Sequence, residues 1–199
     1  MRRAAFLDRD GVINRKAREG EYVTRWEDME ILPGVEKAIA LLNSAGLCVI
    51  VVSNQRCVAK KLISASELEA LHQRMSRALA SKGAKIDAIY YCPHETDPPC
   101  RCRKPQPGML LDAAHDHGIG LDESWMIGDS KADINAGKSA GCKTALVIPD
   151  GTEKAVEADV IASSLLEASQ RILQRDRERL EKGLKRSGGS RIPLMTRKR

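Results

Sequence analysis

The sequence predicts a single α/β domain in which a parallel sheet lies between two layers of helices. Short apolar segments alternate with helical segments along most of the 199 residues, and this alternation is typical of parallel sheets covered on both faces. The run LCVIVV at 47–52 is apolar without interruption, which indicates a strand buried on both faces. Polar clusters follow several of the predicted strands, where the ligand sites of such folds lie.

The predicted strands are short runs rich in apolar and β-branched residues. In chain order they are residues 4–7, 47–52, 86–91, 125–127, 144–148 and 160–161. The helices between them carry start and stop signals: Gly46 ends the first, Ser64 and Glu67 form a capping box at the second, and Pro107 suits the first turn of the third. In chain order the predicted helices are residues 35–45, 64–81, 107–117, 132–140 and 163–174.

The positive charge of the chain is concentrated at its C-terminal end. Residues 171–199 hold 11 Lys and Arg against 3 Asp and Glu, whereas residues 1–170 hold 22 against 24. The apolar periodicity is also lost from about residue 175. We therefore expect a folded domain at 1–174 and a basic, disordered tail at 175–199, although a tail of this kind can also bind RNA or anionic lipid.

The composition and the N-terminal sequence argue against several classes of protein. No stretch approaches the ~18 apolar residues of a membrane-spanning helix, and the start MRRAAFLDRDG has no apolar segment long enough for a signal peptide. Aromatic residues are only 3% of the chain, which argues against a base-stacking platform for nucleic acid. We expect a cytoplasmic monomer, without a membrane or nucleic acid as partner.

Two acidic motifs follow predicted strands. The carboxylates of Asp8 and Asp10 are two residues apart on an extended chain, so they point the same way. Close carboxylates repel unless a cation lies between them or one is protonated, and Mg²⁺ favours carboxylate and phosphate oxygens together. Asp129 and Asp133 follow a later strand and open a helix, which adds acidic groups. Acids that cap a strand or turn, and an ordinary N-cap box, are the alternatives.

Two further motifs offer groups that bind phosphate. Ser53 and Asn54 follow the most apolar strand and supply a hydroxyl, an amide and exposed backbone N–H groups. Lys104 would act as a point charge, and Pro105 after it favours an extended backbone for the lysine. Taken singly, these are a turn with local hydrogen bonds and a surface lysine.

A C-x-H…C-x-C pattern follows the third predicted strand and indicates a metal site. Three sulfurs and one imidazole match a closed tetrahedral zinc site, so we predict a structural Zn²⁺ in a loop at 92–104. Unliganded thiols are the alternative, and disulfides are disfavoured because cytosolic thiols stay reduced. The predicted ligands are Cys92, His94, Cys100 and Cys102.

The order of DxDG, Ser-Asn, Lys-Pro and GDxxxD resembles that of the haloacid-dehalogenase superfamily of phosphohydrolases, over about residues 3–170. The resemblance implies a Rossmann-like three-layer fold in which Asp8 attacks phosphorus and forms an aspartyl-phosphate. It implies that Asp10 acts first as general acid and then as general base, while Ser53 and Lys104 hold the phosphoryl oxygens. The implied Mg²⁺ ligands are Asp8, the backbone carbonyl of Asp10 and Asp129, with Asp133 in support.

The metal pattern followed by Arg-Lys-Pro narrows the resemblance to the heptose-bisphosphate and histidinol-phosphate phosphatases, which lack a large cap domain. The runs DRDGVIN at 8–14 and CRKPQPGML at 102–110 are similar to the heptose branch. The implied reaction removes the 7-phosphate of D-glycero-D-manno-heptose 1,7-bisphosphate, in making lipopolysaccharide or S-layer sugars. Asn54 and Arg103 would contact this sugar phosphate.

Two features depart from the heptose branch. That branch has Ser-Gly and then an Arg-Gly pair after Ser-Asn-Gln, whereas residues 56–61 read RCVAKK here. The spacing between His94 and Cys100 is also shorter than in many heptose enzymes. These departures put the identity of the sugar in question, and a histidinol-phosphate phosphatase or a phosphatase of nucleic-acid ends stays open. A non-catalytic, zinc-stabilised binding module is the alternative from another class, against which the presence of Asp8, Asp10, Lys104 and Asp129 argues. We expect the remaining histidines to lie on the surface or in local hydrogen bonds: His72, His115 and His117.

Overall fold

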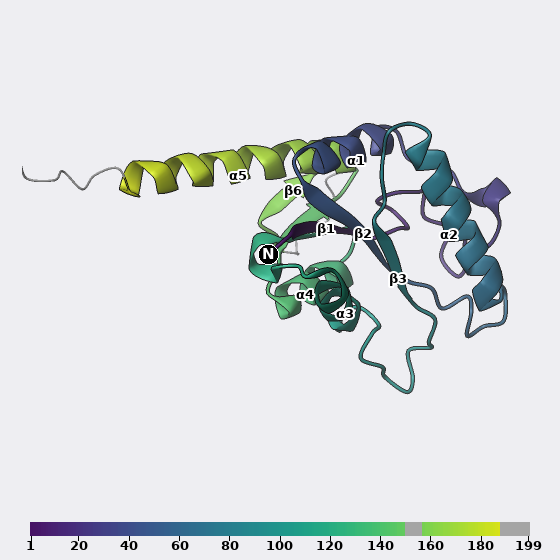
Figure 1. Ribbon diagram of the computed structural model, residues 1–199. Helices are drawn as coiled ribbons and strands as arrows, with labels where there is room; N and C mark the ends of the chain where they lie inside the picture. Colours follow the sequence, from purple (N-terminus) through teal and green to yellow (C-terminus); the bar gives the residue numbers. More distant parts are fainter. Residues whose placement is uncertain (150–156, 188–199) are drawn as a thin grey trace, which may run out of the picture.

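One parallel sheet forms the centre of the protein. The structure, a computed structural model, describes residues 1–149 and 157–187, and in these ranges the sheet has six strands in the order β3-β2-β1-β4-β5-β6 (Figure 1). Each adjacent pair is parallel. The strands are β1 (Arg3–Leu7), β2 (Leu47–Asn54), β3 (Ala88–Cys92), β4 (Trp125–Gly128), β5 (Lys143–Val147) and β6 (Val160–Ala162).

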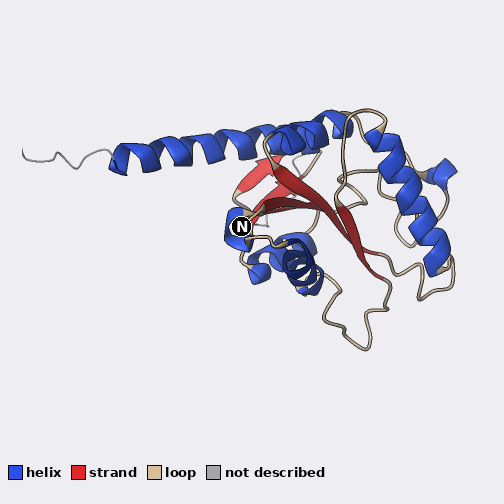
Figure 2. Cartoon of the chain, viewed as in Figure 1, coloured by secondary structure: helices blue, strands red, loops and turns tan. Residues whose placement is uncertain are grey.

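Helices cover both faces of the sheet (Figure 2). In β1, Ala5 and Leu7 enter one core and Ala4 and Phe6 enter the other, because successive side chains of a strand point to opposite faces. This burial on both faces explains why the strands are apolar without interruption. The helices α1 (Val35–Ser44), α2 (Ala65–Ala80) and α5 (Leu165–Ser187) pack on the first face, and α3 (Gly108–His117) and α4 (Lys131–Ala140) on the second.

The register of the central strands aligns their carboxyl ends. Leu7 of β1 pairs with Val51 of β2 on one side and with Ile127 of β4 on the other. The residues that follow these three positions therefore emerge at the same edge of the sheet. This edge is where a parallel α/β fold places its ligand site.

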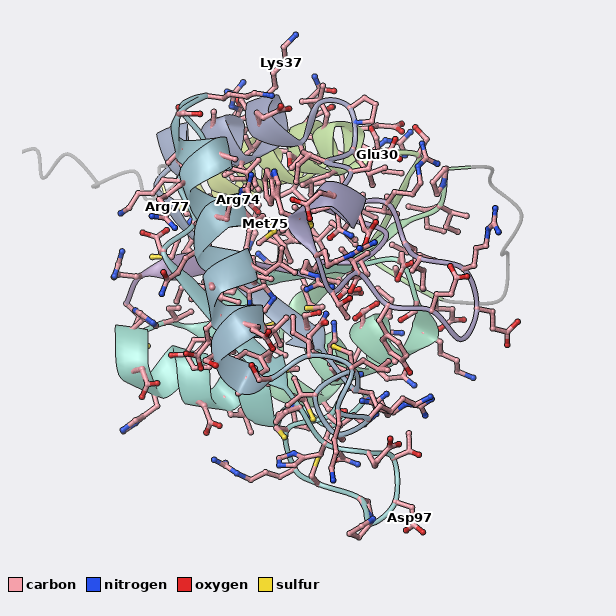
Figure 3. The ribbon with its side chains drawn as sticks, turned by 90° about the vertical axis from the view of Figure 1, so that its right-hand side faces the viewer. Glu30, Lys37, Arg74, Met75, Arg77 and Asp97 are labelled. Atoms are coloured by element: carbon pink, nitrogen blue, oxygen red, sulfur yellow. The ribbon has the colours of Figure 1, made fainter. Side chains whose placement is uncertain are left out.

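The predicted α/β class is confirmed, and each predicted strand and helix has a counterpart. The structure also contains short 3₁₀ helices that were not predicted, Trp26–Asp28 and Leu121–Glu123. The segment 8–34 contains only the first of these, and 93–107 contains no helix or strand, so neither builds a large cap domain. Asp97 marks the outer end of the second segment (Figure 3). Among the described helices, none is both long and apolar enough to cross a membrane.

The predicted end of the last helix is wrong. We placed it at residue 174, whereas α5 continues to Ser187 and projects beyond the body of the protein (Figure 1). The added segment is rich in Arg, Glu, Lys and Leu, which are strong helix formers. The first turn of this added segment still contacts the domain, because Asp176 pairs with Arg3 of β1 at 2.8 Å. Residues 188–199 of the predicted tail lie outside the described ranges.

Candidate active site

The carboxyl edge of the sheet opens into a cavity of about 560 Å³ that gathers polar residues from distant parts of the chain. They come from the segment after β1, the end of β2, the loop after β3 and the segment after β4. All residues that the sequence analysis assigned to catalysis, the substrate or magnesium line this cavity: Asp8, Asp10, Ser53, Asn54, Arg103, Lys104, Asp129 and Asp133.

Lys104 is the buried cation of this site, with 5% of its surface exposed. Its ammonium nitrogen donates hydrogen bonds to Asp8 Oδ1 and to the Val52 carbonyl, both at 2.7 Å, and lies 2.6 Å from Asp133 Oδ1. An ammonium has three N–H donors, so these contacts use all of them. Burial alone would lower the pKa of Lys104, but Asp133 and Asp8 outweigh it and raise the pKa. The side chain is therefore a fixed positive charge.

Asp8, Asp129 and Asp133 form a cluster whose carboxylate oxygens lie within 4.8 Å of one another. Burial raises the pKa of Asp8 to about 7; Lys104 opposes this rise and Asp133 adds to it. Burial also raises the pKa of Asp129, although Lys16 pairs with it at 2.8 Å. A further cation would hold these carboxylates in their ionised form. Such a set of oxygen donors fits a hard divalent ion.

The carboxylate of Asp10 faces a separate set of donors. Arg9 Nη2 donates to it at 3.0 Å, Asn14 Nδ2 at 2.9 Å and Gln55 Nε2 at 2.9 Å. Burial raises the pKa of Asp10, but Arg9 and these hydrogen bonds bring it below its ordinary value. Gln55 also donates to the Ser53 hydroxyl at 2.7 Å. One amide thus ties the two predicted catalytic side chains together.

Arg9 is in turn held by His72 of α2. The two side chains are buried, and Arg9 Nη1 lies 3.1 Å from His72 Nε2. Burial lowers the pKa of His72 to about 3, and the charge of Arg9 acts in the same direction. The neutral ring therefore accepts the hydrogen bond. The expectation of a surface or local role for His72 is wrong, because its partner is 63 residues away in the chain.

Two glycines let the acidic side chains reach this site. Gly11 has φ +93°, and a Cβ there would overlap the carboxylate of Asp129. A Cβ on Gly128 would overlap the side chain of Asp133. Asp133 also accepts a hydrogen bond at Oδ2 from the backbone N–H of Ser130, at 3.0 Å, in a capping box at the start of α4. Asp133 therefore takes part both in the capping box of α4 and in the acidic cluster of the site.

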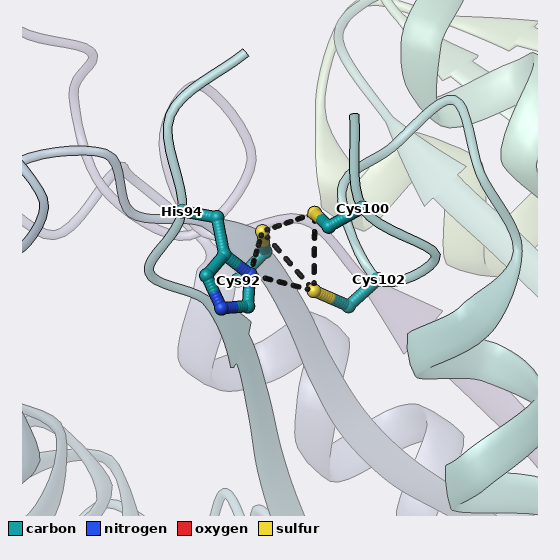
Figure 4. A group of neighbouring side chains, drawn as sticks. All are labelled: Cys92, His94, Cys100 and Cys102. Carbon is teal, nitrogen blue, oxygen red and sulfur yellow. Dashed lines mark hydrogen bonds between the residues drawn. The ribbon is translucent and has the colours of Figure 1, made fainter. Parts of the chain in front are cut away.

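The four predicted metal ligands lie together at the end of β3 (Figure 4). The three sulfurs are 3.3 to 3.5 Å apart, and His94 Nδ1 lies 3.2 Å from Cys102 Sγ and 3.6 Å from Cys92 Sγ. A tetrahedral ion with bonds of about 2.3 Å to sulfur places its sulfurs about 3.8 Å apart. Cys92, His94, Cys100 and Cys102 thus form a set that could hold one metal ion.

Asn54 connects this loop to β2. Its Oδ1 accepts a hydrogen bond from the backbone N–H of Lys104, and its Nδ2 donates to the Lys104 carbonyl, both at 3.0 Å. Asn54 is predicted from the sequence to contact the substrate, whereas its amide here fixes the backbone of the buried lysine. Arg103 donates from Nη1 to the His94 carbonyl at 3.3 Å. The ends of the metal loop are therefore tied to each other and to the sheet.

The fold and this site define a hydrolase of the haloacid-dehalogenase class. The HAD-hydrolase-like family matches residues 101–168. The chain is also similar to the solved structure of the D,D-heptose 1,7-bisphosphate phosphatase from Bordetella bronchiseptica, complexed with magnesium and phosphate. The TM-score is 0.77 with 35% identity, over 87% of this chain and 99% of that one.

Two curated relatives make the assignment more specific. The D-glycero-β-D-manno-heptose-1,7-bisphosphate 7-phosphatase of Pseudomonas putida is 39% identical over 161 residues, which cover 81% of this chain and 91% of the relative. The D-glycero-D-manno-heptose-1,7-bisphosphate 7-phosphatase of Thermosynechococcus vestitus is 41% identical over 157 residues, which cover 73% and 79%. The chain belongs to the family of heptose-1,7-bisphosphate 7-phosphatases, and it is a phosphoric monoester hydrolase.

Proposed function

We propose that this phosphatase removes the 7-phosphate of D-glycero-D-manno-heptose 1,7-bisphosphate. The observation that carries the proposal is the contact between Lys104 and Asp8, 2.7 Å long and buried at the carboxyl edge of the sheet. A carboxylate nucleophile must approach a phosphoryl group that is itself negative, so a fixed cation beside it is required. The substrate is supported by the relatives, which are named for this reaction.

In the proposed reaction, an Asp8 oxygen attacks phosphorus and the bond from phosphorus to the sugar oxygen breaks. Asp10 donates its proton to that leaving oxygen, and the charge of the arriving phosphate favours the protonated form of Asp10 that this step needs. Asp10 then takes a proton from water, which attacks the aspartyl-phosphate and releases free phosphate. Ser53 and Lys104 hold the phosphoryl oxygens during both steps.

Two metal ions belong to this proposal. Asp8, Asp129 and the backbone carbonyl of Asp10 would hold Mg²⁺ with support from Asp133, and bound Mg²⁺ neutralises phosphate charge. Zn²⁺ held by the four ligands at the end of β3 would be structural, because no coordination position stays open. We assign these sites to a catalytic domain at 1–174, including the loop 92–104, and no catalytic role to 175–199.

A substrate panel tests the function. The full chain is assayed for phosphate release with Mg²⁺ on the α and β anomers of the heptose bisphosphate, on histidinol phosphate and on a 3′-phosphorylated oligonucleotide. We expect the highest kcat/KM for a heptose bisphosphate and loss of turnover with EDTA. A higher kcat/KM for histidinol phosphate or the oligonucleotide would overturn the substrate assignment. The variant Asp8→Asn, with unchanged circular dichroism, should show no turnover on any member of the panel.

A further inference from the structure

The turn after β2 borders the catalytic cavity. Arg56 follows Ser53, Asn54 and Gln55 in this turn. It lines the same cavity as Asp8 and Lys104. A large cation from this turn therefore lines the cavity that holds the catalytic groups.

Arg56 is braced through one of its nitrogens. Its Nε donates a hydrogen bond to the Tyr22 hydroxyl at 3.0 Å and lies 3.5 Å from Glu95 Oε2. Within residues 1–149 and 157–187, Nη1 and Nη2 of Arg56 form no hydrogen bond to another side chain or to the backbone. The side chain is 30% exposed. Arg56 thus keeps the planar fork of donors that binds phosphate oxygens in pairs.

Of the five other cations that line the cavity, three contact the catalytic acids; Arg103 instead donates to the His94 carbonyl, and Arg18 lies in the segment after β1. Lys104 contacts Asp8 and Asp133, Lys16 contacts Asp129, and Arg9 contacts Asp10. These three cations lie beside the acids that act on the cleaved phosphate, so they are placed to neutralise the charge of that phosphate. A sugar bisphosphate carries a second phosphate, which needs a cation that no catalytic carboxylate already holds.

We propose that Arg56 binds the phosphate group that is retained, so that this chain selects sugar bisphosphates over sugar monophosphates. The proposal rests on the proposed function, since it concerns the same cavity and the same reaction. Tyr22 holds the guanidinium at Nε and leaves the terminal nitrogens for the ligand. A competing explanation is that Arg56 only braces Tyr22 and Glu95; such a brace would affect all substrates alike.

The test compares two substrates that lose the same phosphate, the heptose 1,7-bisphosphate and the heptose 7-phosphate. In Arg56→Gln, we expect kcat/KM for the bisphosphate to fall about 10- to 100-fold, the usual range for loss of a charged hydrogen bond. For the monophosphate it should stay within about twofold. Arg56→Lys should fall between the wild type and Arg56→Gln, since it keeps the charge without the fork. Tyr22→Phe should lower the ratio of the two values in the same direction, by less.

Lys61→Gln is the matched control, because Lys61 belongs to the same turn and loses the same charge but does not line the cavity. We expect its ratio of the two kcat/KM values to equal that of the wild type. An unchanged ratio in Arg56→Gln, whether both values fall or neither does, would overturn the role of Arg56. A wild type that fails to hydrolyse the bisphosphate would instead refute the proposed function itself, so the two failures are distinguishable.

Discussion

The buried histidine behind Asp10 predicts a measurable loss of stability in mild acid. His72 is 4% exposed and accepts a hydrogen bond from Arg9, whose charge disfavours a proton on the ring. Its pKa is about 3 in the folded chain, against an ordinary value of 6.5. Between these values the unfolded chain binds a proton on this residue and the folded chain does not. The free energy of unfolding therefore falls as the pH falls through this window.

The size of the effect follows from the two pKa values. With an unfolded pKa near 6.5 and a ring that stays neutral in the folded state, His72 alone removes about 2 kcal/mol between pH 7 and pH 5. The variant His72→Gln lacks the titration but keeps an oxygen that can accept the Arg9 hydrogen bond. Its own loss over the same interval should be smaller by about 2 kcal/mol.

Urea unfolding in buffer with added Zn²⁺, followed by circular dichroism at pH 7 and pH 5, measures this difference. The other titrating groups are present in both proteins, so their contributions cancel in the comparison. Equal losses in the wild type and in His72→Gln would refute the reasoning, because they would mean that the buried ring does not exclude a proton. The pH 7 values alone report the packing cost of the substitution.

Further substitutions probe other parts of the structure. Gly11→Ala should raise the Mg²⁺ concentration for half-maximal activity at least about tenfold, because the new Cβ displaces Asp129 and the φ of +93° is strained; an unchanged Mg²⁺ titration would contradict this close approach. Cys100→Ser should lower the bound zinc from about one ion per chain and reduce the Tm by about 5–10 °C, measured by metal analysis and calorimetry; full zinc retention would argue against the ligand assignment. Asp176→Ala should lower the free energy of unfolding by about 1 kcal/mol by removing the ion pairs with Arg3 and Lys143. The same loss in 1 M salt would show that charge is not its cause.

Much of the fold could be predicted because its signals are local or one-dimensional. The capping box of Ser64 and Glu67 involves only neighbouring residues, and it starts α2 as predicted. The apolar run at 47–52 needs no knowledge of its partners, since burial on both faces alone excludes polar residues. The cysteine motif and the pair Asp129 and Asp133 could be found for the same reason, because short spacings place their side chains together once the strand ends are known. The carboxylate of Asp10 instead faces Arg9, Asn14 and Gln55.

What could not be predicted depends on contacts between distant segments. Nothing near His72 in the sequence points to Arg9, because the hydrogen bond joins α2 to the end of β1. The hold of Asn54 on the Lys104 backbone likewise requires β2 and the metal loop to be adjacent. The extension of α5 combines high intrinsic helix propensity with the pairing of Asp176 and Arg3. The apolar periodicity of the sequence reports neither the helix propensity of this segment nor its ion pair.

The central place of β1 governs when the catalytic groups can meet during folding. Ala5 pairs with Trp125, and Lys104 contacts Asp8 across 96 residues of sequence. Contacts of such long sequence separation form slowly, because the intervening chain must first be closed into a loop. A growing polypeptide that ends before Trp125 has an N-terminal strand without its second neighbour and an Asp8 without Asp129. Catalytic competence therefore requires the pairing of β1 with β4, which brings Asp129 beside Asp8.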